Sequence, residues 1–127
     1  MNRPPRVLIV DDDRDNREAY AEYLRYRGYD VTEAATGNEA LSKVNACDPD
    51  IVLLDLRLPD LAGVEVSRHL RATRSRSLSI VALSACVFDG DVETALRNGC
   101  DAFIGKPCLP DMLEAEVRRV LDARAVA

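Results

Sequence analysis

The run Ile51–Asp55 near the middle of the chain constrains the fold more than any other stretch. Four branched apolar residues lead directly into a carboxylate, turn-forming residues precede them, and Pro59 follows. An uninterrupted apolar run of this length is typical of a strand buried on both faces, and such strands belong to parallel sheets covered by helices. Asp55 is therefore predicted at the C-terminal end of a strand, where open α/β sheets bind ligands. Taken alone, Asp55 is equally compatible with the start of a turn.

Further apolar runs, together with a short mixed segment at 29–34 that suits a sheet edge, predict five strands that alternate with five helices. The expected strands span residues 6–10, 29–34, 51–55, 78–83 and 102–105. The expected helices span 14–27, a segment opening at 36–39, 64–72, 89–98 and a last segment from about 109. This alternation predicts a doubly wound α/β fold with a parallel sheet and right-handed crossovers. Leu96 and Met112 are expected on the buried faces of the last two helices, and the tail 123–127 has no evident anchor.

The length of 127 residues suits one domain, and 47% of the residues are hydrophobic, which is enough for a core. No apolar run approaches a membrane span, and residues 1–6 lack the hydrophobic stretch of a signal peptide. Four cysteines without a CxxC pair and a single histidine argue against a zinc site and favour free thiols. A net charge of −5 argues against nucleic-acid binding. We therefore expect a cytoplasmic domain with no direct nucleic-acid or membrane partner.

Reactive polar side chains follow four of the predicted strands. They are Asp11 and Asp12, then Asp55, Ser84 and Lys106. Because the ends of parallel strands meet at one edge of the sheet, we expect these side chains to converge on one site. Three crowded carboxylates repel one another, and a hard divalent cation offsets that repulsion. Mg²⁺ fits this set, because it takes one or two carboxylates, keeps several waters and leaves room for phosphate oxygens.

The same residue types predict phosphate chemistry. A carboxylate such as Asp55 can attack phosphorus and form an aspartyl phosphate. Lys106, one of two lysines in the chain, would neutralise phosphoryl oxygens, and the Ser84 hydroxyl would donate a hydrogen bond. The sequence contains neither the P-loop pattern GxxxxGK nor the dinucleotide pattern GxGxxG. Arg57 stands where haloacid-dehalogenase-like phosphatases carry a second Asp, and three aspartates would repel the phosphate of a flavodoxin-type FMN.

Four short motifs stand at the ends of the predicted strands. They are VLIVDDD at 7–13, DIVLLDLRLP at 50–59 with Gly63, VALSA at 81–85 and GKP at 105–107. Together they resemble the receiver domains of two-component response regulators, the family of the chemotaxis regulator CheY. The resemblance covers residues 6–121 of a single domain that spans 1–127. It implies a five-stranded parallel sheet in the order 2-1-3-4-5.

The resemblance also implies a role for each acidic residue. Asp55 would be the phosphoacceptor. Asp12 and Asp55 would ligate Mg²⁺ directly, together with the backbone carbonyl of Arg57, while Asp11 would act mainly through water. The Arg57 side chain has two open roles, since it would either shield the acyl phosphate from water or point to solvent.

A switch is implied by three further positions. Ser84 takes the place of the family's switch Ser or Thr, and Phe103 takes the place of the switch aromatic. Phe103 would turn inward when Ser84 moves toward the phosphoryl group. Many members carry Tyr at this position, so Phe103 lacks the hydroxyl that would stabilise its outward state. Lys106 would contact the phosphoryl group, and the Lys106–Pro107 bond would be cis.

The resemblance implies a phosphorylation-dependent signalling switch rather than a dedicated enzyme, although receivers catalyse their own Mg²⁺-dependent phosphorylation and dephosphorylation. The expected partners are a sensor histidine kinase or phosphotransfer protein and a downstream target protein or output domain. Two alternatives remain open. One is a protein-interaction module that keeps the fold and signals without phosphate, which Mg²⁺ binding would distinguish. The other is a receiver fragment of a larger regulator or hybrid kinase.

Overall fold

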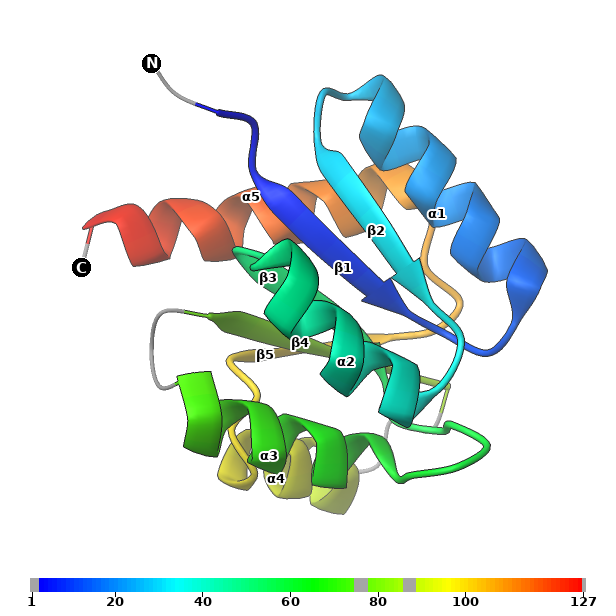
Figure 1. Cartoon of the computed structure of the whole chain (residues 1–127), viewed down its shortest axis with the longest axis vertical. Helices are drawn as coiled ribbons and strands as arrows, with labels where there is room; N and C mark the ends of the chain where they lie inside the picture. The colour runs from blue at the N-terminus through cyan, green and yellow to red at the C-terminus, as the bar shows by residue number, and fades with distance from the viewer. Residues whose placement is uncertain (1–2, 75–77, 86–88, 127) are drawn as a thin grey trace.

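The computed structural model describes residues 3–74, 78–85 and 89–126 of the chain. Five parallel strands form one sheet in the order β2-β1-β3-β4-β5. The strands are β1 (Arg6–Val10), β2 (Asp30–Ala34), β3 (Ile51–Asp55), β4 (Ser79–Ser84) and β5 (Ala102–Gly105). The helices are α1 (Arg14–Tyr26), α2 (Gly37–Cys47), α3 (Gly63–Arg74), α4 (Asp89–Arg97) and α5 (Pro110–Val126). Strands and helices alternate along the chain, which is the doubly wound α/β fold that the sequence predicts (Figure 1).

Two apolar layers, one on each face of the sheet, hold the helices in place. On one face, Leu53 packs in a cluster with Leu24 of α1 and Val117 of α5. On the other face, Leu54 packs in a cluster with buried residues of α2, α3 and α4, including Leu70. Successive side chains of a strand point to opposite faces, so β3 contributes to both layers and is buried along its whole length. Each fully buried Leu stabilises the fold by about 2 kcal/mol.

Local sequence sets the beginning of the two helices that flank the first two strands. Asp13 is the N-cap of α1 and accepts a hydrogen bond from the Asn16 amide at 3.2 Å. Thr36 caps α2 in the same way, through the Glu39 amide. A side-chain acceptor at this position satisfies an otherwise unpaired amide of the first turn. Gly28 ends α1 with a φ of 98°, a left-handed conformation that glycine adopts without a steric cost.

Three expectations for the last two helices were wrong. Leu96 is 47% exposed and Met112 is 59% exposed, because each lies one residue outside the buried stripe of its helix. The tail is anchored rather than loose, since α5 continues to Val126 and the Arg124 guanidinium donates a hydrogen bond to the Asp50 carbonyl at 2.6 Å. None of the helices in the described part of the chain has the length and apolar character needed to cross a membrane.

Candidate functional site

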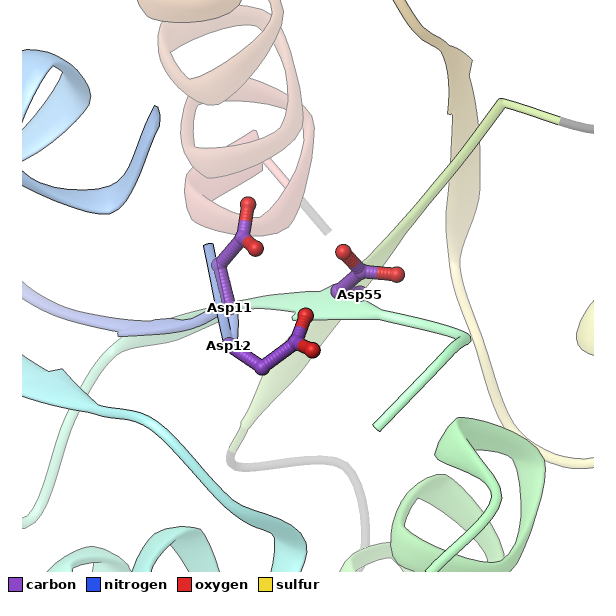
Figure 2. A group of neighbouring side chains, drawn as sticks. All are labelled: Asp11, Asp12 and Asp55. Carbon is purple, nitrogen blue, oxygen red and sulfur yellow. The ribbon is translucent and has the colours of Figure 1, made fainter. Parts of the chain in front are cut away.

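Three carboxylates meet at the carboxyl edge of the sheet. Asp11 and Asp12 follow β1, and Asp55 ends β3, the strand that pairs directly with β1. One oxygen from each carboxylate lies within 4.8 Å of the others (Figure 2). Asp11 is fully buried and Asp55 is nearly so, whereas Asp12 is exposed. The parallel register therefore brings together the acidic residues that the sequence predicts at one site.

Lys106 bridges two of these carboxylates. Its ammonium lies 2.9 Å from Asp11 Oδ2 and 2.8 Å from Asp55 Oδ2. The residue follows β5, and its amide donates a hydrogen bond to the Ser84 carbonyl at 2.8 Å, which ties the end of β5 to the end of β4. The Lys106–Pro107 peptide bond is cis. The long lysine side chain thus reaches across the edge of the sheet to the centre of the acidic cluster.

The electrostatic balance of the cluster keeps Lys106 charged. Burial alone would lower the pKa of Lys106, but the hydrogen bonds and negative charges of Asp55 and Asp11 outweigh it, so the net pKa is raised. Burial raises the pKa of Asp11, although Lys106 and the Asp13 amide oppose that rise. A protonated lysine is therefore available to neutralise negative charge at this edge.

The oxygens of the three carboxylates are not equally available to a ligand. Asp11 Oδ1 accepts the Asp13 amide at 2.9 Å and its Oδ2 accepts Lys106. Asp55 Oδ1 accepts the Arg57 amide at 2.8 Å and its Oδ2 accepts Lys106. The Asp12 carboxylate has no hydrogen-bond or ion-pair partner among the residues that the structure describes. Asp12 is therefore the acid best placed to bind an incoming cation.

A cavity of about 370 Å³ opens over the cluster. Its lining residues are Asp11, Asp12, Asp13, Asn16, Asp55, Arg57, Ala85 and Lys106. The donor set consists of carboxylate oxygens, which are the ligands that a hard cation such as Mg²⁺ takes, and the cavity leaves room for waters or phosphate oxygens beside it. The residues present therefore fit a divalent cation. The backbone carbonyl of Arg57 belongs to the loop that directly follows Asp55.

The two predicted switch residues lie on the neighbouring strands. Ser84 ends β4, is buried, and pairs in register with Gly105 of β5. The preceding residue Leu83 pairs in register with Asp55, so Ser84 lies one residue beyond Asp55 along the direction of the parallel strands. Phe103 is half-buried and packs against the apolar cluster on the α2, α3 and α4 face. The sheet register thus places Ser84 on the strand next to β3, and Phe103 one strand further away, two residues before the partner of Ser84.

Two side chains that the sequence did not single out support the loops of the site. Arg17 of α1 donates a hydrogen bond to the Asp11 carbonyl at 2.9 Å. Asp60, in the loop after β3, accepts the amides of Gly37 and Asn38 at 2.8 Å each and so fastens that loop to the first turn of α2. No sequence motif marks either contact, because each joins segments whose proximity depends on the fold. The one local signal is that Asp60 directly follows Pro59, since Asp favours helix N-termini.

Sequence comparison decides the family. The model of the response regulator receiver domain matches residues 7–118. The chain belongs to this family. The receiver domain is 42% identical over 113 residues to the DNA-binding response regulator MtrA of Mycolicibacterium paratuberculosis, covering 89% of this chain and 49% of that protein. It is 32% identical to the polar-differentiation response regulator DivK of Brucella ovis, covering 80% and 83% of the two chains.

Solved structures agree with this assignment. A CheY-like response regulator receiver domain from Methanospirillum hungatei superposes with a TM-score of 0.91 at 30% identity, covering 96% of this chain and 97% of the other. The chemotaxis response regulator CheY4 of Vibrio cholerae gives a TM-score of 0.85 at 27% identity, covering 92% and 98%. The predicted receiver fold, its strand order and its place in two-component signalling are thereby confirmed. The receiver domain spans about half the length of the MtrA relatives.

Proposed function

We propose that Asp55 accepts a phosphoryl group and that Mg²⁺ binds between Asp12, Asp55 and the Arg57 carbonyl, with Asp11 acting mainly through water. The observation that carries this proposal is the placement of the Lys106 ammonium between Asp11 and Asp55. That geometry provides a nucleophile and a fixed positive charge at one point, beside a carboxylate that is open to the cavity. Bound Mg²⁺ would supply further positive charge to the transferring phosphoryl oxygens.

The phosphoryl donor is a phosphohistidine on a sensor histidine kinase or phosphotransfer protein. An Asp55 carboxylate oxygen forms the new P–O bond, the P–N bond to the imidazole breaks, and the imidazole leaves with its electron pair. Lys106 neutralises the charge that develops on the phosphoryl oxygens. The domain catalyses this transfer to itself and its later hydrolysis, so it acts as a switch and not as an enzyme on other substrates.

The switch follows from the charge added at this edge. A phosphoryl group brings about −1.5 to −2 charge units, which draws the Ser84 hydroxyl and Lys106 toward it. Movement of Ser84 leaves space toward which Phe103 turns, and this changes the face formed by α4 and β5. Shifting a two-state surface from 1:99 to 99:1 needs about 5.5 kcal/mol of differential stabilisation. A few charge-assisted hydrogen bonds at about 1.5–3 kcal/mol each supply an energy of that size.

The output is a downstream protein or a linked domain. MtrA is named as a DNA-binding response regulator, and it is about twice as long as this receiver domain. DivK is named as a polar-differentiation regulator, and this chain covers most of its length. We propose that residues 1–127 form one receiver domain in the cytoplasm, with its core at 6–121, that controls such a partner without itself binding nucleic acid or membrane.

Phosphorylation with acetyl phosphate and Mg²⁺ tests the acceptor. Intact-mass analysis should find one acid-labile phosphoryl group on the wild-type chain and none on Asp55→Asn, because an amide cannot act as the nucleophile. The matched control is Asp15→Asn, an exposed acid in the first turn of α1 that should leave the reaction unchanged. Undiminished phosphorylation of Asp55→Asn would move the acceptor elsewhere.

Titration with Mg²⁺ tests the metal site independently of phosphate. In amide NMR spectra, the signals of Asp12, Asp55 and Arg57 should shift first. The affinity should be weak, because few protein ligands contribute and waters complete the shell. A chain that shows no shift at these amides would fit the alternative of an interaction module that works without phosphate.

A further inference from the structure

The Arg17 guanidinium joins the acidic loop to the edge strand β2. The side chain is only 15% exposed, and its Nη1 donates to the Asp11 carbonyl at 2.9 Å. Its Nε donates to Glu33 Oε1 at 3.2 Å. Glu33 is fixed in turn, because it pairs in register with Ile9 of β1 and its second oxygen accepts Arg25 Nη1 at 3.2 Å. Arg17 thus connects the end of β1 to a carboxylate that the sheet and a second arginine hold in place.

The carbonyl that Arg17 holds belongs to the peptide between Asp11 and Asp12. The Asp11 side chain is already held by Lys106 and by the Asp13 amide. By contrast, neither the amide nor the carboxylate of Asp12 has a hydrogen-bond partner within the described residues. The orientation of the Asp11–Asp12 peptide plane therefore sets the direction in which the Asp12 side chain leaves the backbone.

We infer that Arg17 is a positioning residue for the metal site, which directs the exposed Asp12 carboxylate by clamping the peptide before it to Glu33. The inference rests on the proposed Mg²⁺ site. An outer contact of this kind fixes a ligand before the cation arrives, so that less freedom is lost on binding. A guanidinium suits the role, because its planar fork donates to two acceptors on different elements at once, whereas an ammonium offers a single point of charge.

The metal-binding experiment compares Arg17 with two arginines of the same helix that do not contact the Asp11 carbonyl. Arg17→Ala loses both the Asp11 carbonyl and Glu33. Arg25→Ala also removes a guanidinium from Glu33 but leaves the Asp11 carbonyl untouched. Arg14→Ala changes an exposed residue of the same helix that pairs with Glu18. Mg²⁺ dissociation constants are measured from the NMR shifts of the Asp55 and Arg57 amides, at a temperature where every variant is folded.

The Mg²⁺ dissociation constant should rise about tenfold in Arg17→Ala, the lower end of the effects seen for outer-shell partners. It should stay within about twofold of wild type in Arg25→Ala and Arg14→Ala, and Arg17→Lys should recover only part of the loss. With acetyl phosphate, the Mg²⁺ concentration for half-maximal rate should rise in Arg17→Ala while the rate at saturating Mg²⁺ is kept. An unchanged dissociation constant in Arg17→Ala, or an equal rise in Arg25→Ala, would overturn the inference.

A second readout needs no metal. In the metal-free chain, the Asp13 amide is protected by its bond to Asp11 Oδ1, so its hydrogen exchange reports on the order of the acidic loop. Exchange at Asp13 should be faster in Arg17→Ala and unchanged in Arg25→Ala; equal exchange rates in wild type and Arg17→Ala would contradict the clamp. A wild-type chain that binds no Mg²⁺ but shows this difference in exchange would refute the proposed metal site while leaving the clamp on the acidic loop in place.

Discussion

Replacing Lys106 with methionine should destabilise the fold through the two carboxylates that it leaves behind. Methionine has a similar length but no charge, so Asp11 and Asp55 would face each other without the cation that they share. Asp11 is fully buried and the Asp55 side chain is 9% exposed, so water can replace the ammonium only in part. The loss should therefore exceed that of a surface ion pair.

The size of the loss follows from the burial of the three groups. Removing one partner of a fully buried ion pair costs about 3–5 kcal/mol. The Lys106 side chain keeps 14% exposure beside the open cavity. We therefore expect the free energy of unfolding to fall by about 3 kcal/mol, the lower end of that range, and the melting temperature to fall by roughly 10 °C. A solvated loop lysine would change stability by less than about 0.5 kcal/mol.

Urea unfolding followed by circular dichroism, at pH 7 with a chelator present, measures this loss. Lys43→Met is the matched control, because Lys43 is the other lysine and its side chain is 39% exposed. The double variant Lys106→Met/Asp11→Asn should be more stable than Lys106→Met alone, since one of the two unpaired charges is gone. The reasoning is refuted if Lys106→Met matches wild type, or if adding Asp11→Asn lowers stability further.

Three other perturbations test the loop between β3 and α3, the residue that precedes β3, and the switch. Gly63→Ala should lower the free energy of unfolding, measured in urea, by about 3 kcal/mol. The reason is that the new Cβ would lie 2.5 Å from Leu56 Cα and 2.6 Å from the Asp55 carbonyl. A loss under about 1 kcal/mol would show that the loop shifts to make room for the methyl group. Burial alone would raise the pKa of Asp50, but Arg3 and the Arg6 amide hold it below its usual value. The stability contributed by Asp50 should therefore be complete above about pH 4 and disappear as the pH falls through the pKa of Asp50 in the folded chain. The free energy of unfolding of Asp50→Asn should thus be lower than that of wild type at pH 7 and equal to it in acid. A difference that persists at low pH would contradict this. Beryllofluoride, a phosphoryl mimic, should shift the amides of α4 and Phe103 in wild type but not in Lys106→Ala, and equal shifts in both would refute the coupling role of Lys106.

The strands were predictable because their signal is local. Apolar runs predicted four strands and a short mixed pattern predicted the edge strand β2, each within one residue of its observed ends, and the run ending at Asp55 coincides with β3. The ends of the helices were predicted less accurately than those of the strands, since α3 extends beyond the predicted 64–72 to Arg74. Leu96 and Met112 show the limit of helical spacing, because the spacing gives the direction of a stripe but not its width. The width depends on how closely a helix approaches its neighbours.

Convergence of the acidic residues with Lys106 could also be predicted, since parallel topology puts the ends of all strands at one edge. The contacts of Arg17 could not. Arg17 lies one turn into a helix with other charged residues, and nothing in the sequence distinguishes it from Arg14 or Arg25. The distinction arises from the packing of α1 against β1 and β2, which buries Arg17 and leaves Arg14 exposed.

The sequence by itself determined which residues carry reactive groups and at which strand ends they stand, because burial and alternation are encoded residue by residue. Only the tertiary structure decided how the charges are shared. Lys106 pairs with both Asp11 and Asp55, and the Asp12 carboxylate is left open to the cavity. Those pairings depend on distances of about 3 Å between segments far apart in the chain, and such distances are fixed by the packing of helices on the sheet and not by any local pattern.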